Sequence, residues 1–193
     1  MSKFLVIAEK PSVAQSYAKN LSAYKREDGY LEGESCIVSW CLGHLAEYAQ
    51  PEEYDPKYEK WQFDDLPILP EVWKLKVSKD KKKQFDVLKG LMNRSDVEYL
   101  VNGCDAGREG ELIFQRVYNL AGCRKPVKRL WISSMEDAAI QKGFQTMKSE
   151  EEYKNLCMAA VCRAQADWLI GMNGTRAYTC LLYTSPSPRD STS

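Results

Sequence analysis

FLVIAEK, at residues 4–10, is the stretch that decides the fold of this 193-residue chain. Five consecutive apolar residues that end at a carboxylate predict a short strand buried on both faces, as in a parallel sheet. VEYLV, at residues 97–101, has the same character and also precedes an acidic turn. Helical spacing of apolar residues follows both runs. Strands that alternate with helices predict an α/β fold, in which a sheet of mainly parallel strands is flanked by helices over residues 1–148.

Other patterns predict the elements around these two strands. Four prolines between residues 50 and 73 predict an irregular connection at the surface. Elsewhere we expect a helix from Pro11, a hairpin over residues 29–40, a helix capped by Asp80, a turn at 105–110 with a helix opening at Leu112, a strand over 128–133, a helix that starts in a capping box at 134–137, and a long helix from Glu151.

Changes in composition divide the chain into three parts. A polar stretch at residues 148–150 precedes the long helix, so we expect one domain over 1–148 and the start of a second, mainly helical domain over 149–180. Residues 181–193 are rich in Ser, Pro and Thr, which cannot build a core, and they resemble the translation of a sequencing adapter. We therefore expect a disordered, non-native tail and a natural chain that continues beyond about residue 180.

Composition excludes several classes of protein. The 27 basic and 27 acidic residues give a formal net charge of +0, which excludes a globally basic nucleic-acid binder but allows local phosphate-binding patches. No apolar run approaches the roughly 18–20 residues of a membrane span, and the first apolar run is too short for a signal peptide. The seven cysteines include no Cys-x-x-Cys pair, so we expect reduced thiols packed in the core of a cytoplasmic protein, without a zinc site.

Charged side chains follow both predicted strands at the point where each strand ends. Ligand groups of open α/β sheets gather at the carboxyl ends of strands, so Glu9 and Lys10 could together hold a divalent cation and a phosphate. Asp105, Glu109 and Glu111 place three carboxylates within seven residues, which is unfavourable unless a cation neutralises them. Carboxylate oxygens, with water and phosphate completing the shell, describe a Mg²⁺ site.

Each of these features also has an ordinary structural explanation. Glu9 and Lys10 could form a solvent-exposed ion pair, and the acidic turn could serve a helix N-terminus, where the helix dipole favours negative charge. Arg108 could bind a phosphate oxygen with its forked guanidinium. The glycines at 107 and 110 would let the backbone approach a ligand. The residues alone leave these explanations open.

Five motifs, in order, resemble one known family. They are IAEKPSVA at 7–14, GHL at 43–45, CDAGREGE at 104–111, RLWISS at 129–134 and AQADWLIGMN at 164–173. A glutamate after the first strand and an acidic turn after a later one resemble the Toprim pattern. The sequences of the five motifs are similar to those of the topoisomerase III family of bacterial type IA DNA topoisomerases. The resemblance runs from residue 3 to about residue 179.

The resemblance implies an isomerase that breaks one DNA strand with a tyrosine, passes a second strand through the break and reseals it without ATP. It implies Mg²⁺ bound by Glu9 and Asp105, with Glu109 as a weaker third ligand. Lys10 would act beside Glu9 as a catalytic residue by stabilising charge on the phosphoryl oxygens. Gly107 stands where the general Toprim turn has a second Asp, which weakens the case for two metal ions.

The resemblance also implies contact with single-stranded DNA. It places Trp61, Arg108, Trp168 and Arg176 at DNA-binding positions, and aromatic rings beside cations hold single strands without sequence preference. Both tryptophans could equally be core residues. His44 is expected to be structural or to contact phosphate. The nucleophilic tyrosine is expected in a later domain, so this chain alone should be inactive, and nothing identifies a helicase partner.

Two other functions stay open. A different Toprim enzyme, a nuclease or a primase, would share the acidic residues, but the order of RLWISS at 129–134 and Asp167-Trp168 argues against it. A non-catalytic nucleic-acid-binding α/β module would bind DNA independently of metal. Basic runs at residues 81–83 and 124–129 are usually solvated faces, although they could add weak attraction to phosphate.

Overall fold

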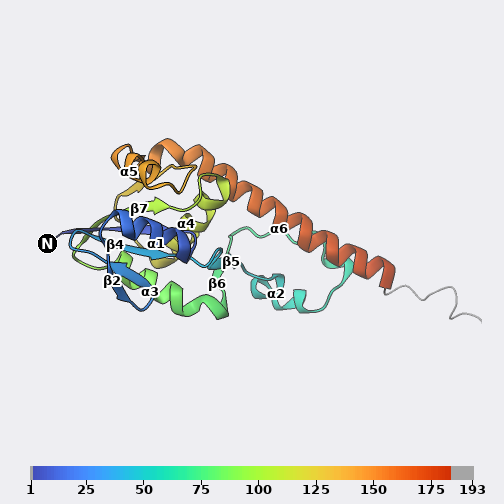
Figure 1. Ribbon diagram of the computed structural model, residues 1–193. Coiled ribbons are helices and arrows are strands. Elements are labelled where there is room, and N and C mark those ends of the chain that lie inside the picture. Colours follow the sequence, from blue (N-terminus) through green and yellow to red (C-terminus); the bar gives the residue numbers. More distant parts are fainter. Residues whose placement is uncertain (1, 184–193) are drawn as a thin grey trace, which may run out of the picture. The chain divides into compact units, whose positions relative to one another are not determined.

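The structure is a computed structural model that describes residues 2–183, and Figure 1 shows its elements. The chain divides into two compact units. The first unit comprises Met1–Glu47 and Val77–Val161, and the second comprises Tyr48–Lys76 and Cys162–Ser193. The predicted domains, 1–148 and 149–180, follow the chain linearly, whereas these units do not. The predicted non-native tail, 181–193, falls outside the described residues except for its first three.

A seven-stranded sheet in the order β2-β3-β4-β1-β7-β8-β9 forms the centre of the first unit. Its four middle strands pair in parallel, and the strands outside them pair antiparallel. The parallel strands are β1 (Lys3–Ala8), β4 (Cys36–Trp40), β7 (Val97–Gly103) and β8 (Val127–Arg129). The antiparallel strands are β3 (Tyr30–Glu32) and the edge strands β2 (Lys25–Glu27) and β9 (Lys148–Ser149). The predicted α/β fold and the hairpin over 29–40 are confirmed.

Helices cover both faces of this sheet (Figure 1). Successive side chains of a strand point to opposite faces. Leu5 and Ile7 of β1 therefore pack with α3 (Lys82–Met92) and α4 (Arg108–Ala121). Val6 and Ala8 pack on the other face with α1 (Pro11–Asn20) and α5 (Asp137–Gln145). All four of these strand residues have no exposed surface, as a fully buried strand requires.

Several predicted boundaries were wrong. α4 begins at Arg108 and not at Leu112, so the acidic residues after Asp105 lie in its first turn. Asp80 lies in a 3-10 helix, Lys79–Lys81, and does not cap α3. The strand expected over 128–133 ends at Arg129, because its pairing with β7 stops at Asn102. α5 begins at Asp137 without a side-chain cap.

The second unit contains the proline-rich segment and most of the longest helix. As predicted, the segment is largely irregular. It holds α2 (Pro51–Tyr54) and the 3-10 helices Pro56–Glu59 and Phe63–Asp65. β5 (Ala46–Tyr48) and β6 (Leu75–Val77) make a separate two-stranded sheet, and the division between the two units falls within both strands. α6 (Lys154–Tyr183) follows a 3-10 helix, Glu150–Tyr153, and enters this unit at Cys162.

The core of the second unit is aromatic. Tyr48, Ile68 and Trp168 are buried in it. The Trp168 ring lies edge-on to the rings of Trp73 and Tyr54, with centroids 5.4 and 5.7 Å away. The proline-rich segment, although largely irregular, thus contributes side chains to a packed core.

The cysteines match the expectation of reduced, packed thiols. All seven are free; six are buried and Cys162 is exposed. Among residues 2–183, no helix combines the length and apolar character needed to cross a membrane.

Candidate functional site

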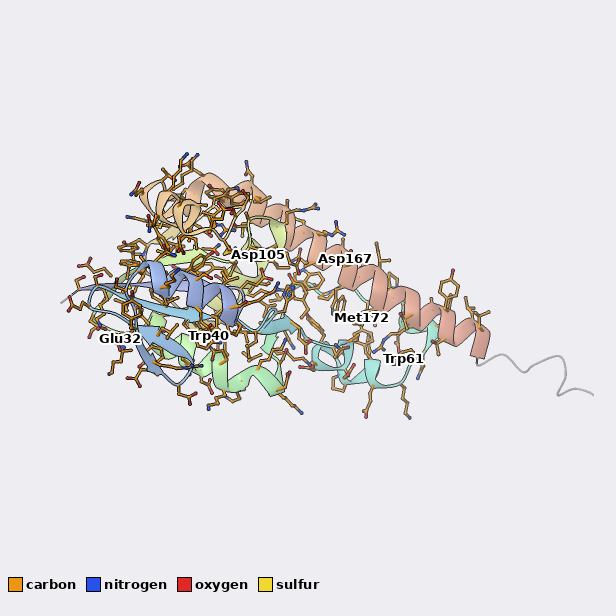
Figure 2. All side chains as sticks on the ribbon, in the orientation of Figure 1. Glu32, Trp40, Trp61, Asp105, Asp167 and Met172 are labelled. Atoms are coloured by element: carbon orange, nitrogen blue, oxygen red, sulfur yellow. The ribbon has the colours of Figure 1, made fainter. Side chains whose placement is uncertain are left out.

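The candidate site lies where β1 and β7 end side by side. These strands are parallel neighbours, and Ala8 is in register with Gly103. Glu9 directly follows β1, and Asp105 follows β7 by two residues. The backbone N–H of Asp105 donates to Glu9 Oε2 over 3.4 Å. Figure 2 labels Asp105 in the first unit. The structure therefore brings together the two carboxylates proposed as the main metal ligands.

The electrostatics at this edge favour a cation. Glu9 is only 8% exposed, and this burial raises the pKa of its carboxyl, with the nearby Asp105 charge adding to the effect. The Asp105 N–H, Lys10 and His44 oppose the rise in the Glu9 pKa without cancelling it. Lys10 Nζ lies 3.9 Å from Glu9 Oε1, and the lysine side chain is 58% exposed, so it can also reach a bound anion. A divalent cation would relieve the repulsion between Glu9 and Asp105.

Glu109, the third candidate ligand, faces a different partner. It lies in the first turn of α4, and its Oε1 pairs with Nε2 of His44. His44 Nδ1 lies 3.5 Å from Nη1 of Arg116, and Lys81 donates to the His44 carbonyl over 2.8 Å. Across residues 2–183, no three acidic, His or Cys side chains converge as a preformed metal site. A role for Glu109 as a ligand stays a prediction.

Arg108 is the first residue of α4 and is exposed. The start of a helix presents unpaired backbone N–H groups and a positive dipole end, both of which favour an anion. Glu109 and Glu111 occupy the same turn, so the negative charge there also serves the helix dipole. Both explanations of the acidic turn that the residues left open are compatible with this geometry.

A buried arginine that the sequence analysis missed supports the loop carrying Asp105. Arg129 has no exposed surface, and its Nε lies 2.5 Å from Oε1 of Glu111, which is equally buried. Its remaining donors reach four backbone carbonyls: Asn102 of β7 (3.0 Å), Cys104 (2.7 Å) and Asp105 (2.8 Å) of the following loop, and Leu130 directly after β8 (2.9 Å). The available signal was that Arg129 is the first residue of the motif at 129–134 and directly precedes the apolar residues Leu130, Trp131 and Ile132.

Gly110 lets this loop pack against α4. A Cβ atom at this position would lie 2.1 Å from the carbonyl oxygen of Asp105, which real atoms cannot do. Nothing lies within 4 Å of the corresponding point at Gly107. The expectation that both glycines admit a ligand is therefore wrong for Gly110, whose missing side chain makes room for the protein's own backbone.

Two of the residues assigned to DNA are buried in the second unit. Trp168 is 8% exposed, and its Nε1–H donates to the carbonyl of Ala49 over 3.1 Å. Arg176 is 5% exposed, and its Nη1 donates to the carbonyl of Tyr58 over 2.6 Å. Both side chains tie the irregular segment to α6. The indole has no open face on which a base could stack, so direct contact with DNA by Trp168 would need a rearranged core.

Trp61 remains accessible. It is 45% exposed, and the Arg176 guanidinium lies 4.9 Å from the centre of its ring. Figure 2 labels Trp61 in the segment that faces α6 within this unit. Asn173 of α6 also anchors the segment: it accepts from the N–H of Ile68 over 2.6 Å and donates to its carbonyl over 3.0 Å. Asn173 belongs to the motif at 164–173, but its sequence context alone did not indicate this anchoring role.

This chain is similar to several known proteins. The model of the Toprim domain family matches residues 4–135. The protein named DNA topoisomerase 3 from Bacillus subtilis (strain 168) is 51% identical over 179 residues, which are 93% of this chain and 25% of that protein. The protein of the same name from Bacillus licheniformis is 49% identical over the same lengths. A solved structure of full-length topoisomerase I from Thermotoga maritima is 18% identical, with a TM-score of 0.49 over 75% of this chain and 21% of that one.

The chain spans about a quarter of the length of these Bacillus relatives. The identity extends past the Toprim match, since 179 residues also include part of the second unit.

Proposed function

The chain belongs to the Toprim domain family, and from this premise we propose that it supplies the metal- and phosphate-binding part of a type IA DNA topoisomerase. The observation that carries the proposal is the meeting of Glu9 and Asp105 at the ends of adjacent parallel strands. The Bacillus relatives are named DNA topoisomerase 3, which gives the class of reaction as a change in DNA topology. Breaking and rejoining one strand is what the resemblance to type IA enzymes implies.

Metal binding is a property of Toprim domains in topoisomerases, and the donors of this chain fit a hard divalent cation. Glu9 is a carboxylate whose burial and proximity to Asp105 disfavour its charge, so a cation between the two would be bound favourably. Oxygen donors of this kind suit Mg²⁺. A bound Mg²⁺ would neutralise and orient the phosphate that is broken and rejoined.

The chain's own residues would bind and position the phosphate. Lys10 is exposed beside Glu9 and would stabilise charge on the phosphoryl oxygens. Arg108, exposed at the first turn of α4, would hold a neighbouring phosphate with its guanidinium. The tyrosine that attacks the phosphodiester would come from a segment outside this chain. We therefore expect the 193-residue chain alone to bind metal and DNA weakly and to leave supercoiled plasmid unrelaxed.

For single-stranded DNA we propose one exposed contact in the second unit, Trp61. Its free surface allows a base to stack, and the Arg176 guanidinium holds its ring on the protein side. Trp168 and Arg176, which the resemblance assigned to DNA directly, would act by fixing the segment that carries Trp61.

Metal binding tests the first part of the proposal. Mn²⁺, a probe that suits the same oxygen ligands, can be titrated into the chain and followed by electron paramagnetic resonance. Glu9→Gln and Asp105→Asn should each weaken binding by at least about tenfold. Glu98→Gln is the matched control, because Glu98 is an exposed carboxylate on β7, away from its carboxyl end. Equal affinity in all four proteins would refute the site.

DNA binding tests the second part. Trp61→Ala should weaken binding of a fluorescent single-stranded oligonucleotide by roughly 1–3 kcal/mol, the usual contribution of a base stacked on an aromatic ring. Tyr24→Ala is the control, because Tyr24 is an exposed aromatic residue of the first unit that belongs to none of the motifs. Mg²⁺-dependent nicking of plasmid by the chain would instead favour a Toprim nuclease.

A further inference from the structure

Glu150 is a carboxyl group that the proposed chemistry does not use, although it lies against the support of the Asp105 loop. It begins the 3-10 helix Glu150–Tyr153, directly after β9. Asn102 of β7 and Glu111 of α4 are its hydrogen-bonding neighbours. Its Oε2 is buried and, within residues 2–183, has no hydrogen-bond partner. A carboxylate in this position would be short of donors.

The donors around Glu150 are already engaged. The Arg129 guanidinium donates to Glu111 and to four backbone carbonyls. The Asn102 amide donates to Glu111 Oε2 over 3.3 Å, and its oxygen accepts from the N–H of Cys104 over 3.2 Å. Both oxygens of Glu111 therefore accept a hydrogen bond. The Asn102 side chain also hydrogen-bonds Glu150, but in the described part of the chain Glu150 Oε2 is still left without a partner. A proton on this oxygen would let Glu150 donate to Glu111 and complete the network.

The charges lead to the same conclusion. Arg129 and Glu111 are fully buried and neutralise each other. An ionised Glu150 would add an uncompensated negative charge next to Glu111, and two carboxylates in contact cannot both ionise at neutral pH. Burial and the Glu111 charge raise the pKa of Glu150 to about 7, although the Arg129 charge and the Asn102 hydrogen bond oppose the rise. The titratable groups that interact with it are Glu111 and Tyr118 of α4, Arg129 of β8 and Cys157 of α6. Lys125, Glu151 and Lys154 line the same pocket as Glu150.

We propose that Glu150 is a positioning residue for the candidate metal site: as a neutral acid it donates a proton to Glu111, and it thereby keeps Arg129 fixed under the loop that carries Asp105. When Glu150 loses this proton, repulsion displaces one of the two carboxyl groups. Arg129 then loses a fixed partner, and its hydrogen bonds to the carbonyls of Cys104 and Asp105 loosen. The effect on metal binding rests on the function proposed above, whereas the shared proton does not.

The Nε–H of Arg129 reports the shared proton directly, because it donates to Glu111. Its resonance can be followed by nuclear magnetic resonance in the 193-residue chain from about pH 5 to about pH 8.5. In the wild type we expect it to shift with a midpoint near 7. In Glu150→Gln it should stay at its low-pH position throughout, because a side-chain amide donates to Glu111 at every pH. Glu151→Gln, an exposed neighbour, is the control and should titrate like the wild type.

Mn²⁺ binding provides the second measurement. The affinity of Glu150→Gln should equal that of the wild type at about pH 6 and exceed it by about tenfold at about pH 8, the low end of effects from outer partners of metal ligands. A merely structural glutamate would show no such divergence.

The outcomes separate the two proposals. A wild-type Arg129 resonance that does not shift near pH 7, or one that shifts equally in Glu150→Gln, overturns the shared proton. A shift that is lost in Glu150→Gln supports the shared proton, even if Glu9→Gln and Asp105→Asn bind Mn²⁺ normally and so refute the metal site. If the metal site is real but the two affinities stay equal at both pH values, Glu150 does not position Asp105.

Discussion

Each unit contains a buried arginine: Arg129 near the strand ends of the first unit and Arg176 in the second unit. The two units differ in whether the residues expected to bind a ligand are exposed or buried. In the first unit, Arg129 is buried and supports the loop that carries Asp105, whereas the functional groups, Asp105 and the nearby Arg108 of α4, are exposed. In the second unit, Trp168 and Arg176, which the family resemblance assigned to DNA, are themselves the buried support. A residue in a family motif can therefore be a candidate ligand contact in one unit and a structural support in the other. The exposed fraction of its side chain distinguishes the two roles.

The largest expected effect tests the support in the first unit. Arg129→Met leaves the Glu111 charge buried without a partner, which typically destabilises a protein by about 3–5 kcal/mol. Urea unfolding followed by circular dichroism measures the loss. Arg108→Met, an exposed arginine only three residues from Asp105, should change stability by no more than about 0.5 kcal/mol. If the two variants lost the same free energy of unfolding, Arg129 would not support the fold more than the exposed Arg108 does.

The next effect tests the second unit. Trp168→Ala removes a ring packed between Tyr54 and Trp73, and such truncations cost about 3 kcal/mol or more. The same urea experiment applies. Trp61→Ala, at an exposed position, should cost about 1 kcal/mol or less. If Trp61→Ala proved the more destabilising, the burial of Trp168 would not be what holds this unit together.

A smaller effect depends on pH. The pKa of Glu150 is raised from 4.5 to about 7, so the folded protein binds more protons than the unfolded chain between these values. The stabilisation is fully present below about pH 4.5 and is lost as pH rises through about 7. Because the group is only partly buried, we expect a loss of about 1–2 kcal/mol.

Unfolding of Glu150→Gln over the same pH range provides the comparison. The variant lacks the titrating group, so this part of the pH dependence should vanish, whereas Glu151→Gln should keep it. A pH profile of stability that is the same in the wild type and Glu150→Gln would show that Glu150 is not held as a neutral acid.

The smallest effect is expected at an exposed ion pair. Arg163 Nε and Asp167 Oδ2 lie 3.6 Å apart, one helical turn from each other on α6. Both side chains are more than 60% exposed, so Arg163→Met should cost only about 0.3–0.5 kcal/mol. Comparison with Arg129→Met then measures how much burial adds to an arginine–carboxylate pair. A loss above about 1 kcal/mol would mean that Arg163 has contacts beyond Asp167.

Local patterns predicted the elements that have strong, uninterrupted signals. The strand at residues 4–8, the hairpin over 29–40 and the helix from Pro11 all form as expected. Helix starts were placed less well, because no side-chain hydrogen bond caps α3, α4 or α5. A prediction that looks for capping side chains has no signal at such starts.

The sequence by itself determined the alternation of strands and helices, and it therefore determined that Glu9 and Asp105 both follow strands of one parallel sheet. Only the tertiary structure decided that these strands are direct neighbours, that Glu109 turns to His44, and that Glu150 meets Glu111. The physical reason is that periodicity and turn chemistry act between residues close in the chain. Strand order and the sharing of a buried proton instead depend on long-range packing, which excludes water and leaves each polar group to find a partner within the fold.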